Sequence, residues 1–420
     1  MTAKFLYNTV IGASNLLLGV RARLAGKDSR SKTVLFARGQ RDLLSRIRTE
    51  MGDGRGRYTV WFHAASLGEF AVARPLIKRL KEECECVVVV TFFSPTGYEA
   101  LKRRPAFIDH VFYLPLDTRK NARAFLDAVR PDRAVFMISE YWCNYLEELK
   151  GRGIPTYLVS ALIHRQAPFF KWYGGIYRRC LAAYTHVFVL DEASRGNLRA
   201  LGCDRVTVCG DPLFDNAALI ARTPWSDAVV ERFAGGGDVF IAGSISDRTD
   251  LELVASLANR HRDIRFLFVP HEINPEEFAH IREAVEGGVA FHSACDAGTD
   301  FSGVQVLVID FVGALASLYR YARWAYVGGG FTPLLHSVIE ATVYGIPVSF
   351  GPEIHRKVTP QQLTDLHIGQ VVKNSEEIQQ WFAALKRNEA ELARVKETAA
   401  GYVSKNVGAT DRIVAMIKPY

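Results

Sequence analysis

The segment YTVWFHAASLGEFAVARPLIKRLKEECECVVVVTF, residues 58–92, contains two short apolar stretches on either side of an amphipathic one. Tyr58–His63 and Cys86–Phe92 are rich in β-branched and aromatic residues, which favours strands. Phe70–Glu83 between them has its apolar residues at helical spacing. A strand, a helix and a second strand in this order predict a βαβ unit, in which the two strands lie parallel in one sheet.

The same alternation continues towards the C-terminus. Further strands are predicted at Val111–Leu114, Arg133–Ile138, Thr156–Ser160, His186–Leu190 and Val206–Cys209. Gly210–Gly237 interrupts the pattern with two prolines and a triple glycine, and the alternation then resumes. The second set of predicted strands is Val239–Ala242, Arg265–Val269, Val289–Phe291, Gln305–Ile309, Trp324–Val327, Pro347–Phe350 and Gly369–Val372. Two doubly wound, Rossmann-like α/β domains are therefore expected, joined by a hinge near residue 215.

Length and composition agree with this division. A chain of 420 residues exceeds what a single hydrophobic core usually serves. Hydrophobic residues make up 49% and charged residues 23%, which excludes a disordered chain or a small disulfide scaffold. We expect an N-terminal helix and basic connector over 1–57, a first Rossmann-like domain over 58–215 and a second over 216–420. The second domain includes a polar helical tail, Ser375–Met416, long enough to cross back to the first.

The positive charge of the chain is concentrated at its N-terminus. Residues 1–60 contain twelve basic and four acidic residues, whereas the rest of the chain is close to neutral. Nucleic-acid binding normally needs a basic face on the folded domain itself, so no nucleic-acid partner is expected. A basic arm at the N-terminus is better suited to the anionic surface of a membrane.

An apolar stretch, Phe5–Val20, precedes five basic residues: Arg21, Arg23, Lys27, Arg30 and Lys32. This stretch of sixteen residues is shorter than the ~20 that span a bilayer. A helix that lies in the membrane interface, with cations beside the headgroups, is one interpretation. A first helix packed on its own domain is the other, and the sequence favours neither.

Ligands of doubly wound sheets bind outside the carboxyl ends of the strands, and two such sheets facing each other would place an active site in the cleft between the domains. The first predicted strand ends in His63-Ala-Ala-Ser-Leu-Gly-Glu69. Ser66, with Glu69 three residues later, has the spacing of a helix capping box. Alternatively, the small residues of this turn, Gly68 among them, let a ligand approach, and Glu69 accepts a proton from an attacking hydroxyl.

A second carboxylate, Glu140, follows the fourth predicted strand and precedes Tyr141 and Trp142. An unpaired carboxylate buried among aromatic rings is costly. We therefore expect Glu140 to face the same edge of the sheet, where it orients a substrate or pairs with an arginine.

Three strand-end loops of the second half carry candidate ligand-binding groups. They contain Gly243, His271 and the triple glycine Gly328–Gly330. A helix expected to start near His336 would add free backbone N–H groups and its dipole, which together form an anion site; a plain turn is the alternative. His336 and Glu340 would then share one helix face and contact a ribose or phosphate, or form only a surface pair.

Several other chemistries lack their motifs. No G-x-G-x-x-G follows the first strand and no G-x-x-x-x-G-K-[ST] occurs, which argues against dinucleotide and P-loop sites. Neither an H-x-x-x-H pattern nor a cysteine cluster at zinc spacing is present, so no metal site is expected.

Taken together, these motifs resemble the 3-deoxy-D-manno-octulosonic acid (Kdo) transferases, GT-B glycosyltransferases of lipid A biosynthesis. The resemblance covers nearly the whole chain and is most specific at His63–Glu69, at His336 with Glu340, and at Phe350–Pro352. The supporting segments are the N-terminal apolar helix, Glu140–Trp142, Phe170–Gly175, Gly210-Asp with Phe214-Asp215, Ala242–Ser244, Pro270–Glu272 and Val327–Phe331.

The resemblance implies transfer of Kdo from CMP-Kdo to a lipid A precursor, with inversion at the anomeric carbon, in assembly of the lipopolysaccharide inner core. Glu69 corresponds to the general base, Glu140 to an orienting or supporting acid, and Ser66 and Gly68 to the acceptor site. The implied donor-binding residues are Gly243, Ser244, His271, Gly328, Gly329, Gly330, His336, Ser337 and Glu340. No cofactor or metal is implied. The protein would work at the cytoplasmic face of the inner membrane, as a peripheral or monotopic protein.

The chain departs from the family at three places. Ser337 stands where asparagine usually follows the histidine, Leu213 stands where a basic residue is usual, and Ile245–Arg248 differs from the common threonine-containing form. Two alternatives stay open: another GT-B nucleotide-sugar enzyme, such as an epimerase or an N-acetylglucosaminyl transferase, or a membrane-bound scaffold without turnover. The candidate partners of the Kdo carboxylate, which the sequence does not rank, are Arg74, Arg165 and Arg248.

Overall fold

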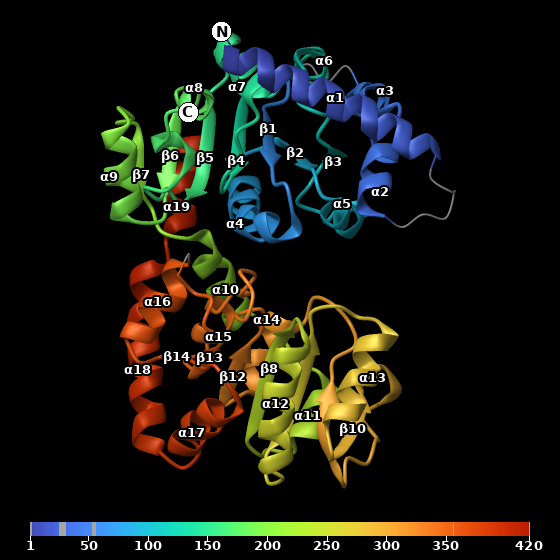
Figure 1. The fold of residues 1–420 in the computed structure, drawn as a ribbon, viewed down its shortest axis with the longest axis vertical. Coiled ribbons are helices and arrows are strands. Elements are labelled where there is room, and N and C mark those ends of the chain that lie inside the picture. The colour runs from blue at the N-terminus through green and yellow to red at the C-terminus, as the bar shows by residue number, and fades with distance from the viewer. Residues whose placement is uncertain (1, 25–30, 53–55, 356, 420) are drawn as a thin grey trace. The chain divides into compact units, whose positions relative to one another are not determined.

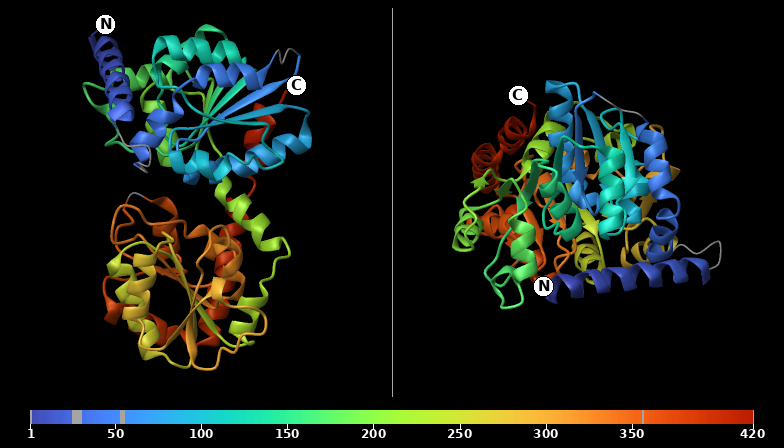
Figure 2. Two further views of the ribbon diagram at one scale, coloured as in Figure 1. Left: turned by 90° about the vertical axis from the view of Figure 1, so that its right-hand side faces the viewer. Right: turned by 90° about the horizontal axis from the view of Figure 1, so that it is seen from above.

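The computed structural model describes residues 2–24, 31–52, 56–355 and 357–419. They form two compact units. The first unit contains the chain up to Asn216 together with the residues from Val407 onward, and the second contains Ala217–Asn406. Each unit is built around a seven-stranded sheet that carries helices on both faces (Figures 1 and 2). The doubly wound α/β fold expected from the sequence is therefore confirmed.

The sheet of the first unit has the strand order β3-β2-β1-β4-β5-β6-β7, and its paired strands are parallel. Its strands are β1 (Thr59–His63), β2 (Val87–Phe92), β3 (His110–Tyr113), β4 (Arg133–Met137), β5 (Thr156–Ala161), β6 (His186–Val189) and β7 (Val206–Val208). Its helices are α1 (Thr2–Leu24), α2 (Lys32–Gly39), α3 (Leu43–Met51), α4 (Leu67–Glu83), α5 (Pro95–Leu101), α6 (Arg119–Val129), α7 (Cys143–Gly151), α8 (Gly175–Leu181), α9 (Glu192–Ala200) and α19 (Ala409–Ile417). The strand order reverses between β1 and β4, which marks the position where such sheets bind ligands.

The sheet of the second unit has the order β10-β11-β9-β8-β12-β13-β14, again with parallel pairs. Its strands are β8 (Val239–Ile245), β9 (Arg265–Pro270), β10 (Gly288–Phe291), β11 (Val304–Val308), β12 (Trp324–Val327), β13 (Val348–Phe350) and β14 (Gly369–Val371). Its helices are α11 (Ala228–Ala234), α12 (Arg248–Arg260), α13 (Pro275–Ala284), α14 (Leu315–Leu318), α15 (Ile339–Thr342), α16 (Val358–Asp365), α17 (Ser375–Leu385) and α18 (Glu389–Asn406), and α10 (Pro212–Arg222) spans the division between the units. Every strand predicted from the sequence is present.

Burial on both faces holds the ends of β1 and β2 in place, since every residue of these two strands is buried. On one face, Leu76 of α4 and Ile413 of α19 belong to the same apolar cluster as the strands. On the other face, Ile47 of α3, Phe125 of α6 and Leu146 of α7 do the same. Each large apolar side chain removed from water contributes ~1.5–3 kcal/mol, so the turns that follow these strands rest on a rigid base.

The C-terminal residues pack on the first unit, which corrects the expected assignment of all of 216–420 to the second domain. Asp215 accepts hydrogen bonds from the backbone N–H groups of Gly408 (2.5 Å) and Thr410 (2.7 Å). Ile413, Val414 and Ile417 of α19 are buried in the apolar cluster that also contains α4. Residues 407–420 therefore complete one face of the first sheet.

The N-terminal residues also differ from the expected helix and basic connector over 1–57. Helices α2 and α3 bury Phe36 and Ile47 in the core of the first unit. The 23-residue helix α1 lies beside α2 and α8 (Figure 1). Its Tyr7 hydroxyl donates to buried Asp117, and the side chain of Asn8 accepts a hydrogen bond from that of Asn144. One face of α1 is thus docked on its own domain.

The opposite face of α1 is apolar and exposed. It presents Phe5, Leu6, Val10, Leu17 and Leu24 to the surroundings. Within the described residues, no helix combines the length and the apolar character needed to cross a membrane. Lys27, Arg30 and the side chain of Arg23, which belong to the predicted basic cluster, lie outside the described residues.

Candidate functional site

The turn after β1 forms the predicted helix cap. Ser66 Oγ accepts a hydrogen bond from the Glu69 N–H (3.3 Å), and Glu69 Oε2 accepts one from the Ala65 N–H (2.5 Å). These two bonds satisfy backbone donors at the start of α4 and orient the Glu69 carboxylate. A Cβ built at Gly68 would meet only Ser66 Oγ, 3.8 Å away, so the space beside this turn is open.

Glu69 caps the helix, and its carboxyl also has an unusually high pKa. Burial raises its pKa to about 7, and the nearby Glu140 adds to the rise, while the backbone N–H groups of Ala65 and Ser66 oppose it. A carboxyl with a pKa near neutrality is suited to accept a proton at physiological pH. The capping role and the role of a base are therefore compatible in the same side chain.

Glu140 is bonded to an indole and lies beside an imidazole, and no arginine pairs with it among the described residues. Its Oε2 accepts a hydrogen bond from Trp142 Nε1 and lies 3.4 Å from His63 Nε2. The Tyr184 hydroxyl donates to the backbone oxygen of Glu140. The carboxylate of Glu140 is only 12% exposed, so the expected pairing with an arginine is replaced by contacts within the sheet edge.

His63, the last residue of β1, was not among the expected site residues. Trp61 Nε1–H donates to Thr91 Oγ1 (2.8 Å), and Thr91 Oγ1 shares a hydrogen bond with His63 Nδ1 (2.9 Å). His63 Nε2 faces Glu140 at 3.4 Å and has no hydrogen-bond partner among the described residues. The position of His63 at the start of the His63–Glu69 motif was the only sequence signal for it.

In the second unit, Gly243 and Ser244 lie inside β8 and not in a loop after it, which corrects the sequence-based expectation. The pairing of β8 with β9 shifts between Gly243 and Ile245, and Ser244 has a φ of 55°. A Cβ at Gly243 would come within 2.4 Å of the Tyr319 hydroxyl. Close packing therefore explains the glycine at this position without a ligand.

The triple glycine is held by a buried carboxylate that the sequence analysis missed. Asp250 of α12 accepts hydrogen bonds from the Gly329 N–H (2.8 Å), the Tyr326 hydroxyl (2.6 Å) and the Ser246 N–H (3.0 Å). Gly329 has a φ of 83°, which favours glycine. Since its N–H is already bound, Gly329 cannot supply a free backbone donor to an anion.

The helix expected near His336 begins only at Ile339 and is four residues long. His336 therefore precedes α15, and the expected anion site at a helix N-terminus does not form there. His336 Nε2 lies 2.9 Å from Ser246 Oγ, and its ring centroid lies 4.3 Å from that of His271. Burial, together with His271 and Lys357, lowers the pKa of His336 to about 4, so the imidazole is neutral at pH 7.

Two further expected donor residues lie close to His336 in the sequence. Burial raises the pKa of Glu340 to about 7. Ser337 Oγ is buried without a hydrogen-bond partner among the described residues. A buried hydroxyl without a partner is uncommon, and a bound ligand is one way to satisfy it.

The remaining expected positions differ in their surroundings. Leu213, where the resemblance leads one to expect a basic residue, packs against the apolar cluster around α4. Arg74 is half-buried, and its Nε has no partner within the described part of the chain. Arg165 and Arg248 are exposed.

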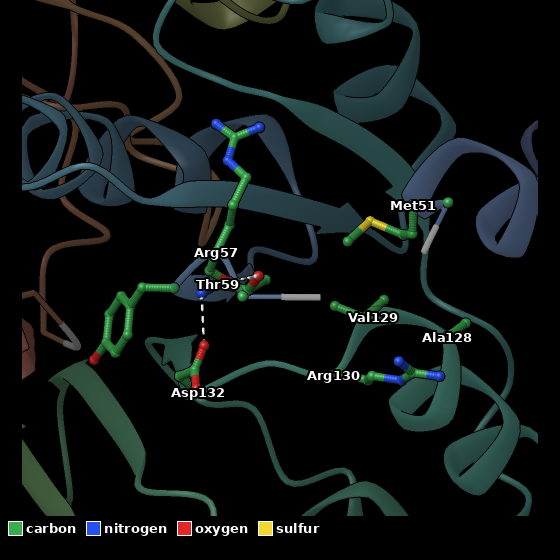
Figure 3. A pocket seen from close by; sticks show the side chains of 10 residues that line it. Met51, Arg57, Thr59, Ala128, Val129, Arg130 and Asp132 are labelled. Carbon is green, nitrogen blue, oxygen red and sulfur yellow. Dashed lines mark hydrogen bonds between the residues drawn. The ribbon is translucent and has the colours of Figure 1, made fainter. Parts of the chain in front are cut away.

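A cavity of about 490 Å³ lies at the amino ends of the strands of the first sheet, opposite the ends that Glu69 and Glu140 follow (Figure 3). Arg57, Thr59, Arg130 and Asp132 are among its lining residues, and the Thr59 N–H donates to Asp132 Oδ2 (2.7 Å). These residues precede or begin β1 and β4, so the cavity lies at the amino ends of the strands, away from Glu69. Among the residues that the structure describes, no group of three or more His, Cys, Asp and Glu side chains is arranged to hold a metal ion.

Comparison with known proteins gives concordant results. A family model described as 3-deoxy-D-manno-octulosonic-acid transferase matches residues 33–216. The 3-deoxy-D-manno-octulosonic acid transferase of Chlamydia trachomatis serovar A is 26% identical over 324 residues, 74% of this chain and 74% of that protein. The enzyme of the same name from Haemophilus influenzae is 24% identical over 383 residues, 86% of this chain and 87% of that protein.

A solved structure with a similar fold is the UDP-GlcNAc 2-epimerase from Neisseria meningitidis bound to UDP-GlcNAc. It has a TM-score of 0.61 and 14% identity, covering 85% of this chain and 98% of that chain. At this identity the likeness concerns the fold alone. With its two doubly wound sheets and its carboxylates at the strand ends, the protein is a glycosyltransferase of GT-B architecture. Its sequence is similar to that of the Kdo transferases, whose family model matches residues 33–216 and whose members align with up to 86% of the chain.

Proposed function

We propose that this protein transfers Kdo from CMP-Kdo to a hydroxyl group of a lipid A precursor, with inversion at the anomeric carbon. The observation that carries the proposal is the Glu69 carboxyl, which follows β1 beside an open turn and has a pKa of about 7. Glu69 takes the proton of the acceptor hydroxyl, and the oxygen of that hydroxyl forms a bond to the anomeric carbon of Kdo. The bond from that carbon to the phosphate oxygen breaks, and CMP leaves with the electron pair.

The donor is assigned to the second unit by the resemblance of its motifs. One short segment supplies three different polar groups for the donor: the neutral imidazole of His336, the unpartnered hydroxyl of Ser337 and the carboxyl of Glu340. CMP carries a single phosphate, and the proposal assigns no metal or cofactor to the reaction. Asp250 acts on this site through the glycine turn that it holds.

The acceptor is a membrane lipid in this proposal, and the protein works at the cytoplasmic face of the inner membrane. The exposed face of α1 supports this location, since Phe5 is 76% exposed. The neighbouring segment before α8 presents Trp172, which is 93% exposed, next to Lys171. Aromatic and basic residues side by side are typical of membrane interfaces. A hollow of about 550 Å³ beside α1 is lined by Lys4, Arg119 and Arg179, whose charges suit lipid phosphates.

Mass spectrometry of a lipid A precursor incubated with CMP-Kdo and the purified protein tests the proposal. The expected result is a product heavier by one or more Kdo residues. This transfer would be a step in assembly of the lipopolysaccharide inner core. Turnover of UDP-N-acetylglucosamine without reaction of CMP-Kdo would instead favour another nucleotide-sugar enzyme. CMP binding without any transfer would indicate a scaffold.

A further inference from the structure

Phe93 places an exposed aromatic ring beside the Glu69 turn. It is the first residue after β2 and is 38% exposed, whereas the strand itself is buried throughout. Its N–H donates to the backbone oxygen of Ala65 (3.3 Å), and the N–H of Ala65 holds Glu69 Oε2 (2.5 Å). Phe93 and Glu69 are therefore both hydrogen-bonded to the same residue of the turn after β1.

Phe93 belongs to a row of four rings along this edge. Its ring centroid is 4.4 Å from that of Phe36 and 5.4 Å from that of Trp142, which in turn lies 5.3 Å from His63. The two outer members, Phe36 and His63, are buried, and the two inner members are partly exposed. The hydrogen bond from Trp142 Nε1 to Glu140 fixes the indole in its plane.

We infer that Phe93 and Trp142 form the surface on which a pyranose ring of the acceptor saccharide lies, and that Phe93 contributes to acceptor affinity. The inference rests on the proposed function. A pyranose has an apolar C–H face that packs on aromatic rings through dispersion, and its hydroxyl groups extend from the rim. The carboxylates of Glu69 and Glu140 lie beside this aromatic surface, where the hydroxyl groups of the sugar would extend. A ring bound here would present its hydroxyl groups to the proposed base.

Exposure of a large aromatic side chain is otherwise unfavourable at this position. Complete burial of a phenylalanine side chain stabilises a fold by ~1.5–3 kcal/mol, and the partly exposed Phe93 contributes only part of this free energy. A ligand that covers the ring would recover the remainder. An acyl chain also covers apolar surface, but it does not require flat rings, and this difference separates the two ligands experimentally.

The test measures binding of a phosphorylated glucosamine disaccharide without acyl chains to the full-length protein by calorimetry. Phe93→Leu keeps an apolar side chain without a ring, and Phe93→Tyr keeps the ring. We expect Phe93→Leu to weaken binding about fivefold and Phe93→Tyr to stay within about twofold of the wild type. Phe107→Leu, at a half-buried ring ahead of β3, is the matched control and should bind normally. In the transfer assay, Phe93→Leu should raise KM for the acceptor and leave CMP affinity unchanged.

Equal affinity of the wild type and Phe93→Leu for the disaccharide overturns the inference. It is also overturned if the acyl-free disaccharide fails to bind the wild type while the acylated precursor binds in a Phe93-dependent manner, because the ring then contacts an acyl chain. Absence of Kdo transfer by the wild type would refute the proposed function alone, since the binding measurement needs no turnover.

Discussion

Replacement of Glu69 by glutamine is expected to slow transfer and, at the same time, to stabilise the fold at alkaline pH. Burial and the neighbouring Glu140 raise the pKa of this carboxyl from 4.5 to about 7. Glutamine keeps an acceptor oxygen for the Ala65 N–H, which bonds to Glu69 Oε2 in the wild type. It cannot take a proton from a hydroxyl group, and loss of a general base typically slows a reaction ~10²–10⁴-fold.

The effect on stability follows from the direction of the pKa change. A carboxyl whose pKa is higher in the folded than in the unfolded chain binds its proton more tightly in the folded state. The native state therefore loses stability as the pH rises from 4.5 through about 7. The difference between the two pKa values corresponds to about 3 kcal/mol once the carboxyl is fully ionised, of which about 2.5 kcal/mol develops between pH 5 and pH 8.

Chemical unfolding of the wild type and Glu69→Gln at pH 5 and pH 8 measures this difference. The gain in unfolding free energy of the variant over the wild type should be ~2.5 kcal/mol larger at pH 8 than at pH 5. Glu85→Gln, at an exposed carboxylate between α4 and β2, is the matched control and should show no such dependence on pH. An equal gain at both pH values, or transfer by Glu69→Gln at the wild-type rate, would refute the assignment of Glu69 as a buried base.

Three further predictions concern other residues. Asp250→Ala removes the acceptor of three hydrogen bonds, including that of Gly329, and should weaken CMP binding about tenfold in calorimetry; unchanged affinity would separate the glycine turn from the donor site. Glu140→Gln removes a negative charge near Glu69, so the acidic limb of the pH profile of kcat/KM should move to lower pH, and a limb that does not move would contradict coupling between the two carboxyls. Phe5→Glu, on the exposed face of α1, should reduce cosedimentation with anionic vesicles without changing Tm; full retention of vesicle binding would indicate that α1 only packs on its domain.

The strands could be located from the sequence because a parallel sheet that is covered on both faces needs short, continuous apolar segments. Tyr58–His63 and Cys86–Phe92 are such segments, and the strands formed there are Thr59–His63 and Val87–Phe92. The carboxylates at the strand ends followed from the same reasoning, since Glu69 and Glu140 come shortly after predicted strands. The resemblance of motifs then indicated the family, which the comparisons support.

The roles of the glycines were accessible only from the tertiary structure. Gly243 and Gly329 both follow the pattern of ligand-binding loops in the sequence. Gly243 is required by the Tyr319 hydroxyl, and the N–H of Gly329 is bound by Asp250, 79 residues away in the chain. Local sequence cannot reveal a partner that another helix supplies.

The sequence alone determined the α/β architecture, the position of Glu69 in the first turn of the helix after β1 and the apolar character of the N-terminal helix, because each depends on local pattern. Tertiary structure decided which face of α1 docks on the domain, which unit the C-terminal residues join, and how acidic Glu69 is. These properties depend on burial and on groups distant in the chain, such as Asp117, Asp215 and Glu140. Folding brings those groups together, and their spacing along the chain does not predict that they will be in contact.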